Sequence, residues 1–166
     1  MNANVTLGLQ ILTPTDTTIV LKRTFNAPRR LVWEAMFTPD KMERWMLPPP
    51  GWTIASIECD ARVGGKISIA WKSAEANPAM TLKGEFTELV QHEYAVHTEN
   101  MALGTGESIG SLVERHEFAE KGAATAMTIT QTYKSKEDRD GALASGMDEG
   151  MEACYQKLEA LLGERK

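Results

Sequence analysis

"DARVGGKISIAWK", residues 60–72, joins a turn signal to a strand signal. Two consecutive glycines mark the turn, and apolar and polar residues alternate strictly after them. Alternate residues of a strand lie on the same face of a sheet, so Ile67, Ile69 and Trp71 share one face. This face is expected to be either a packed core or the wall of a cavity, and the residues alone leave both interpretations open.

The composition is that of one globular domain. The chain has 166 residues, enough for one substantial core, and 42% of them are hydrophobic while 25% are charged. Its formal net charge of -5 argues against nucleic acid as a partner, because phosphate binding requires a basic face. We therefore expect no nucleic-acid partner.

The sequence also lacks the usual marks of export or membrane insertion. No apolar run approaches the roughly 20 residues that cross a bilayer, and the start, MNANVTLGLQILTPTDTT, has no basic end followed by an apolar segment. Cys59 and Cys154 show no metal-ligand spacing, which favours two reduced thiols over a disulfide. We expect a cytoplasmic protein with no membrane partner.

Strand patterns dominate the chain as far as residue 133. A strand over residues 17–25 precedes two short helical patterns, in which Pro28 and Pro39 suit the first turns. Turn signals then separate six further strands, at residues 52–59, 66–72, 80–90, 94–101, 111–118 and 125–133. Short connections favour antiparallel pairing of consecutive strands.

The C-terminal segment changes to a helical period. Ser135 and Asp138 form a capping-box-like start, and Gly163 suits the end of the helix. One long helix is predicted, with an apolar stripe that faces the sheet: Met147, Met151, Cys154, Leu158 and Leu161. Gly146 and Gly150 each cost about 1 kcal/mol relative to alanine in such a helix. We therefore expect either close approach to the sheet there or room for a bound molecule.

These elements predict an α+β fold. One antiparallel sheet of about six or seven strands cannot bury its apolar face alone, and the long amphipathic helix is the obvious cover. A twisted sheet of that size curves around the helix and leaves space near the helix ends. We expect residues 1–16 to be a flexible arm and residues 17–163 to be the single domain.

Four segments resemble one protein family: FNAPRRLVWEAMFTPDKMERWM, DARVGGKISIAW, GEFTEL and SGMDEGMEACYQKLEALL. The family is that of the activator-of-heat-shock-ninety-ATPase homologues, within the START-like superfamily (SRPBCC, birch-pollen-allergen-like). The resemblance runs from about Thr17 to Leu162. It implies the helix-grip fold, in which a curved antiparallel sheet wraps around a long C-terminal helix. Many bacterial members carry a tryptophan where this chain has Met147.

The resemblance also implies a largely apolar cavity between the sheet and the last helix. Such a cavity would hold a small hydrophobic ligand, whose identity the sequence does not give. The residues predicted to line it are Trp45, Ile69, Trp71, Phe86, Glu114, His116, Gln131, Met147 and Met151. Methionine side chains suit a wall that meets a variable guest, because they are flexible and polarizable.

The strand SLVERHEF carries the most informative polar residues. If Phe118 aligns with an inward aromatic residue of the family, Glu114 and His116 also face inward, and Gln131 on the next strand is in phase to join them. A carboxylate and an imidazole in an apolar cavity require a partner or a ligand, which would make them a recognition cluster. The alternative is a wet sheet edge, or a bulge that turns both residues to solvent.

Other kinds of site receive less support from the sequence. The histidines His92, His97 and His116 lack the spacing of a metal site, so we expect no metal and no cofactor. Asp60 and Arg62 suit an ion pair that braces the glycine turn. A glutamate–histidine pair can perform acid–base chemistry, but no third group joins it, so a cyclase- or hydratase-like enzyme is the less favoured function.

Binding of a small apolar ligand is thus the leading function predicted from the sequence. A co-chaperone-like protein-interaction module is the alternative and would use an exposed surface. A chaperone partner is suggested by the family name alone, because only the eukaryotic co-chaperone of the family is an activator. Whether the chain forms a homodimer stays open.

Overall fold

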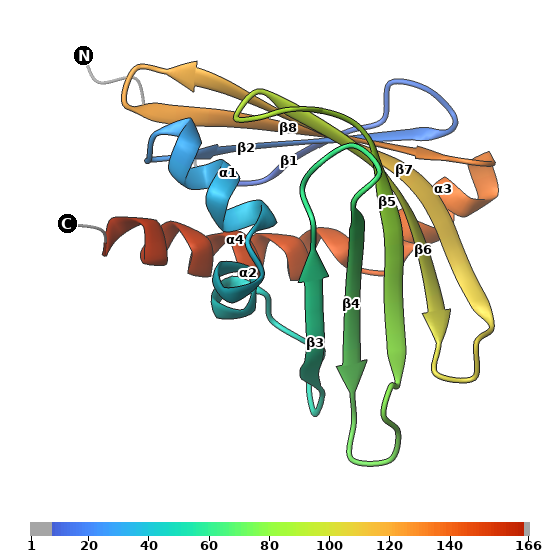
Figure 1. Ribbon diagram of the computed structural model, residues 1–166. Helices are drawn as coiled ribbons and strands as arrows, with labels where there is room; N and C mark the ends of the chain where they lie inside the picture. Colours follow the sequence, from blue (N-terminus) through green and yellow to red (C-terminus); the bar gives the residue numbers. More distant parts are fainter. Residues whose placement is uncertain (1–7, 165–166) are drawn as a thin grey trace.

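The computed structural model describes residues 8–164, which form a curved antiparallel sheet and four helices (Figure 1). The strands are β1 (Gln10–Leu12), β2 (Thr18–Phe25), β3 (Thr53–Cys59), β4 (Lys66–Lys72), β5 (Met80–Val90), β6 (Tyr94–Leu103), β7 (Ser108–Lys121) and β8 (Ala124–Tyr133). The helices are α1 (Arg29–Phe37), α2 (Pro39–Trp45), α3 (Lys136–Ala144) and α4 (Met147–Gly163).

The strands described form one sheet in the order β1-β2-β8-β7-β6-β5-β4-β3, and every neighbouring pair is antiparallel. The sheet curves around α4, which confirms the predicted helix-grip fold (Figure 1). The eight strands exceed the predicted six or seven because β1 pairs with the edge of β2, placing Gln10 opposite Lys22. β1 lies within the predicted arm, of which residues 1–7 are outside the described residues.

The glycine turn before β4 has the shape that its sequence requires. Gly64 has a φ of 83°, which glycine adopts without strain. A Cβ atom on Gly65 would lie 1.9 Å from the carbonyl oxygen of Asp60, so only glycine fits there. Arg62 Nε donates to Asp60 Oδ2 at 2.7 Å, which confirms the predicted bracing ion pair. The face of β4 that carries Ile67, Ile69 and Trp71 is buried, and Trp71 is only 7% exposed.

Three register shifts bend the sheet. The extra residues are Ala55 of β3, Thr87 of β5 and Ile109 of β7. An extra residue in one strand of a pair increases the local twist and curvature. The bulges therefore help the central strands to curve around the core.

The C-terminal helix is not continuous as predicted. Gly146 has a φ of 79° and separates α3 from α4, because a left-handed residue ends a right-handed helix. Gly150 lies inside α4 and is exposed. A Cβ atom added at either glycine would meet no other atom within 4 Å, so neither glycine marks a close approach to the sheet.

The buried face of α4 is rotated from the predicted stripe. Tyr155, Leu158 and Leu162 are buried at 3%, 1% and 7% exposure. Of the predicted stripe only Leu158 is fully buried, and the other members, half-buried, pack against the edge of the core: Met147, Met151, Cys154 and Leu161. The reason is an aromatic contact, since the Tyr155 ring packs edge-on against Phe25 of β2 at 5.6 Å.

A buried arginine fixes α4 to the sheet. Arg23 of β2 is 4% exposed, and its Nε lies 3.2 Å from Glu152 Oε2. Its Nη1 lies 3.8 Å from Glu159 Oε2, two helical turns along. Glu152 also accepts the backbone N–H of Leu9, so the same carboxylate ties the helix to the segment before β1.

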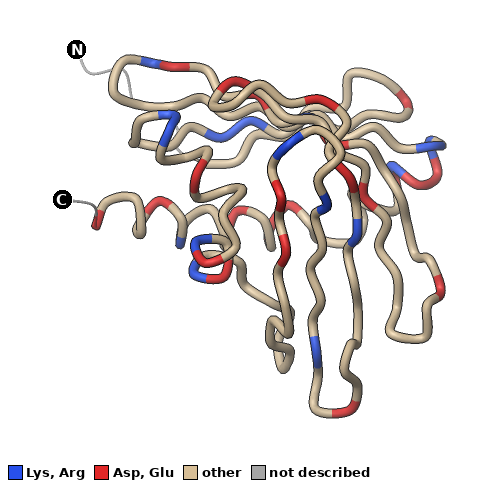
Figure 2. The backbone as a smooth tube through the Cα atoms, in the orientation of Figure 1, with Lys and Arg blue, Asp and Glu red and all other residues tan. Residues whose placement is uncertain are grey.

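Charged residues of both signs are interspersed along the chain (Figure 2). Within residues 8–164, none of the helices combines the length and the apolar character that a membrane span needs.

Candidate functional site

The ladder register places a row of inward residues across the middle of the sheet. Phe86 of β5 is opposite His97 of β6, and His97 is opposite Glu114 of β7. Glu114 is in turn opposite Gln131 of β8, which is opposite Ile19 of β2. Directly opposed residues of antiparallel strands lie on the same face. An apolar residue therefore ends the row on each side, and three polar residues lie between.

Strand alternation widens this row into a polar cluster. His116 is two residues from Glu114 on β7, Glu99 is two residues from His97 on β6, and Tyr133 is two residues from Gln131 on β8. We call these residues the polar cluster: His97, Glu99, Glu114, His116, Gln131 and Tyr133. His97, Glu114, His116 and Gln131 are buried at 1%, 7%, 4% and 5% exposure. Glu114 and His116 thus face inward, and the solvent-facing alternative is wrong.

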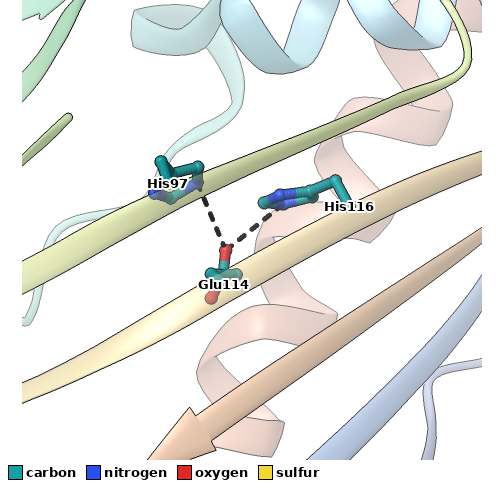
Figure 3. A group of neighbouring side chains, drawn as sticks. All are labelled: His97, Glu114 and His116. Carbon is teal, nitrogen blue, oxygen red and sulfur yellow. Dashed lines mark ion pairs between the residues drawn. The ribbon is translucent and has the colours of Figure 1, made fainter. Parts of the chain in front are cut away.

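The centre of the cluster is the Glu114 carboxylate (Figure 3). Its Oε1 atom lies 3.3 Å from His116 Nε2 and 4.0 Å from His97 Nε2. Its Oε2 atom accepts a hydrogen bond from Gln131 Nε2 at 2.8 Å. Gln131 Oε1 accepts from the Tyr133 hydroxyl at 2.9 Å, which extends the network toward the half-buried end of β8. The two imidazole rings are stacked, with centroids 5.6 Å apart.

The hydrogen bonds fix the orientation of His97. Its Nδ1 atom lies 3.3 Å from the carbonyl oxygen of Thr98, and a carbonyl oxygen can only accept, so Nδ1 carries the proton. The Glu99 carboxylate lies on the same side of the ring, 3.7 Å from Nδ1. This orientation leaves Nε2 as the ring nitrogen that faces Oε1 of Glu114.

Burial changes the protonation of the cluster. It lowers the pKa of His116 to about 4, and the nearby Glu114 carboxylate offsets only part of this effect. The His116 imidazole is therefore neutral at pH 7. Burial, and to a lesser extent the Glu114 carboxylate, raises the pKa of Glu99 well above its ordinary value. Burial is also the main cause of the raised pKa of Tyr133.

One buried nitrogen of the cluster has no partner. Among the described residues, none forms a hydrogen bond with His116 Nδ1. The ring is surrounded by aromatic side chains, with Phe37 edge-on at 5.4 Å and Phe118 stacked at 6.3 Å. Buried polar atoms without partners are rare and cost about 1–3 kcal/mol.

Apolar residues of β4, β5 and β6 lie on the inward face beside the polar cluster. The ladder places Ile69 of β4 opposite Leu82 of β5, and Leu82 opposite Met101 of β6. Trp71 is likewise opposite Met80. Ile69 and Trp71 are buried, whereas the other three side chains are half-buried. This part of the inward face therefore keeps some apolar surface accessible.

The remaining predicted site residues are spread through the core. Phe86 is fully buried, and its ring centroid lies 5.3 Å from that of His97, which brings it to the polar cluster. Met147 and Met151 are half-buried on the first turns of α4. Trp45 is 6% exposed, packs near Tyr155 and donates from Nε1 to the carbonyl oxygen of Ala35 at 2.8 Å. It therefore joins α2 to α1 and α4, and no recorded contact joins it to the polar cluster.

Two surface grooves of the described chain lie elsewhere. One runs between Leu9 and Ile11 and the α4 residues Asp148, Glu149, Glu152, Ala153 and Gln156. The other is lined by residues of β2, β7 and β8, among them Lys22 and Lys121. Neither groove is lined by a residue predicted for the ligand site.

Sequence reasoning missed three members of the cluster, His97, Glu99 and Tyr133, and also Arg23. A signal for the first two was present, because Ala95, His97, Glu99 and Met101 alternate along one strand. The spacing of ligands within one segment does not reveal this group, because His97 meets Glu114 across a ladder between two strands. His97, Glu114 and His116 each offer a ligand atom, and these atoms lie within 4.8 Å of one another.

Comparison with known proteins gives one family and a set of similar folds. The family model described as "Activator of Hsp90 ATPase homolog 1-like protein" matches residues 26–163. No curated protein sequence matches the chain.

Several solved bacterial structures are similar in fold. A crystal structure from Rhodobacter sphaeroides has a TM-score of 0.83 and 22% identity, over 93% of this chain and 97% of that one. A crystal structure from Mycobacterium smegmatis has a TM-score of 0.80 and 20% identity, and the match covers 95% of this chain and 98% of that one. A solution structure from Arthrobacter aurescens has a TM-score of 0.78 and 22% identity, over 94% and 92%. At these identities the likeness shows a shared fold.

Proposed function

Because the chain belongs to the family of activator of Hsp90 ATPase homolog 1-like proteins, we propose that it binds a small ligand with an apolar body and an uncharged polar head. The ligand lies between the inward face of the sheet and α4, and the polar cluster holds the head. The observation that carries the proposal is the buried Nδ1 atom of His116, which has no hydrogen-bond partner among the described residues.

The half-buried apolar residues support the position of the ligand body. Leu82 and Met101 on the sheet and Met147 and Met151 on α4 are half-buried. Leu82, Met147 and Met151 pack against the core cluster that contains Trp71. Methionine side chains adapt to a guest because their thioether chains are unbranched and flexible. The ligand therefore makes room by moving these side chains.

The charges of the cluster support an uncharged head. Glu114 supplies a carboxylate, and the neutral His116 adds no positive charge to balance it. A carboxylate head would place like charges together in a buried site, which is unfavourable. A hydroxyl or amide head carries no such charge and can form a hydrogen bond with His116 Nδ1.

Displacement of a polarity-sensitive fluorescent dye tests the proposal. Metal-free protein is titrated with the dye, which is then displaced by 1-dodecanol or by dodecanoate at pH 7. We expect the alcohol to displace the dye at a lower concentration than the carboxylate does. Equal or stronger displacement by the carboxylate, or the absence of dye binding, contradicts the proposal.

Two matched substitutions locate the site. Leu82→Gln alters the inward face of β5, and Val113→Gln alters an aliphatic residue of β7 that is 42% exposed. We expect Leu82→Gln to weaken dye binding by at least tenfold, on the scale of losing one apolar contact, and Val113→Gln to leave it unchanged. The opposite order would place the ligand on the other face of the sheet.

A further inference from the structure

The three atoms that converge at the centre of the polar cluster are typical metal ligands. His97 Nε2 and His116 Nε2 both approach Glu114 Oε1, from neighbouring strands (Figure 3). These residues are buried, and within the described chain the recorded ion pairs of Glu114 involve only these two imidazoles. We propose that His97, Glu114 and His116 bind one divalent transition-metal ion, for which zinc is the best match.

The distances fit a tetrahedral ion with a small adjustment. Zinc bonds to imidazole nitrogen and carboxylate oxygen are about 2.0–2.2 Å, so two ligands of a tetrahedral site lie about 3.4 Å apart. Glu114 Oε1 and His116 Nε2 are already 3.3 Å apart, and His97 Nε2 is 4.0 Å from the same oxygen. All three ligand atoms lie within 4.8 Å of one another, so a movement of His97 toward the other two completes the set.

The surrounding hydrogen bonds are those that orient metal ligands. A ligating imidazole usually donates its other N–H to a carbonyl or carboxylate, which directs the free nitrogen toward the ion. Thr98 and Glu99 fill this role for His97. The Gln131 amide holds the second oxygen of Glu114, which leaves Oε1 for the ion.

The orientation of His97 suits a metal ligand. Its Nδ1 atom approaches the carbonyl oxygen of Thr98, so its Nε2 atom is directed toward Glu114 Oε1. A divalent ion between these two atoms would be bound by both of them.

The ligand types select the class of ion. Two imidazoles and one carboxylate suit zinc and its neighbours in the first transition series, whereas calcium and magnesium prefer oxygen ligands alone. Three protein ligands leave a fourth tetrahedral position for water or for a ligand group. The proposal concerns the same cluster as the ligand proposal but does not depend on it.

Titration of metal-free protein with Zn²⁺ by calorimetry tests the proposal. We expect one ion per chain, and Co²⁺ in place of Zn²⁺ should give the visible absorption of a tetrahedral site. Glu114→Gln, His97→Gln and His116→Gln should each weaken Zn²⁺ binding by at least about tenfold. His92→Gln is the matched control, since His92 is the one histidine of the sequence outside the cluster, and it should bind as the parent does.

The outcomes separate this proposal from the other. Stoichiometric binding that survives Glu114→Gln, or is lost in His92→Gln, overturns the metal site, as does a parent protein that binds neither ion. If a cluster variant fails to fold, the Co²⁺ spectrum of the parent decides alone, because a tetrahedral nitrogen–oxygen site has its own absorption. Dye binding is measured without metal and metal binding without dye, so either proposal can fail while the other stands.

Discussion

His97 of β6 and Glu114 of β7 are direct partners across an antiparallel ladder, with Nε2 4.0 Å from Oε1. Gln131 continues the pairing on β8 and donates to the other carboxylate oxygen. The contacts are thus set by strand register and do not depend on a loop. Side chains on regular strands hold their geometry more closely than side chains on loops do.

Replacing Glu114 with leucine should destabilise the protein, because Gln131 loses its hydrogen-bond acceptor. An unsatisfied buried donor costs about 1–3 kcal/mol. The double variant Glu114→Leu/Gln131→Leu should recover much of this loss, because two apolar residues need no partner. Urea unfolding of both single variants and the double variant measures the coupling. Additive losses would show that the two side chains do not act as a pair.

Replacing Arg23 with alanine should cost far more than replacing an exposed arginine. Arg23 is 4% exposed, and its removal leaves the Glu152 and Glu159 carboxylates without their cation, a loss of about 3–5 kcal/mol. Arg62→Ala is the control, because the Arg62–Asp60 pair lies in solvent and should contribute little. Chemical denaturation compares the two variants. Similar losses in both would mean that Arg23 does not fix α4 to the sheet.

Cys59 should react very slowly with alkylating agents. Burial, with a smaller effect of Asp60, raises the pKa of its thiol to about 12. The thiolate is the reactive form, so its fraction at pH 8 falls roughly a thousandfold below that of a free cysteine with a pKa of about 8.5. In a Cys154→Ser variant the rate should rise about tenfold per pH unit between pH 8 and 10. The same variant in denaturant serves as the reference, and equal rates in both states would refute the prediction.

Gly150→Ala should stabilise the protein, whereas Gly146→Ala should destabilise it. Gly150 is exposed within α4 and a Cβ atom there meets nothing, so alanine gains helix propensity of about 1 kcal/mol. Gly146 also has open space, but its φ of 79° strains any other residue, by about 1–2 kcal/mol. Thermal unfolding of the two variants should shift in opposite directions. A loss of stability in Gly150→Ala would mean that α4 needs flexibility at that point.

The sequence predicted those features that depend on local pattern. Strand alternation identified seven strands and the inward face of β4, and the Gly64–Gly65 turn and the Asp60–Arg62 pair followed from turn chemistry. β1 was missed because three residues carry too little periodicity, and Pro14 beside them favoured an irregular segment. The break at Gly146 was missed because the helical pattern continues through it.

Features that depend on pairing between distant segments were harder to predict. Glu114, His116 and Gln131 were identified because they alternate on strands that carry a family pattern. His97 required the register between β6 and β7, and the bulge at Phe86 shifts that register for β5. Arg23 alternates with apolar residues in β2, yet its partners Glu152 and Glu159 are more than a hundred residues away.

The burial of α4 increases along its length, from the half-buried Met147 and Met151 to the buried Leu158 and Leu162. Gly146 also disconnects its first turn from α3. The backbone amides of the first turns should therefore exchange hydrogen through local fraying, whereas those near Leu158 exchange only when the whole domain opens. The first turns of α4 therefore need the least free energy to separate from the sheet. A molecule that enters beneath them can reach the inward face of the sheet while the rest of the domain stays folded.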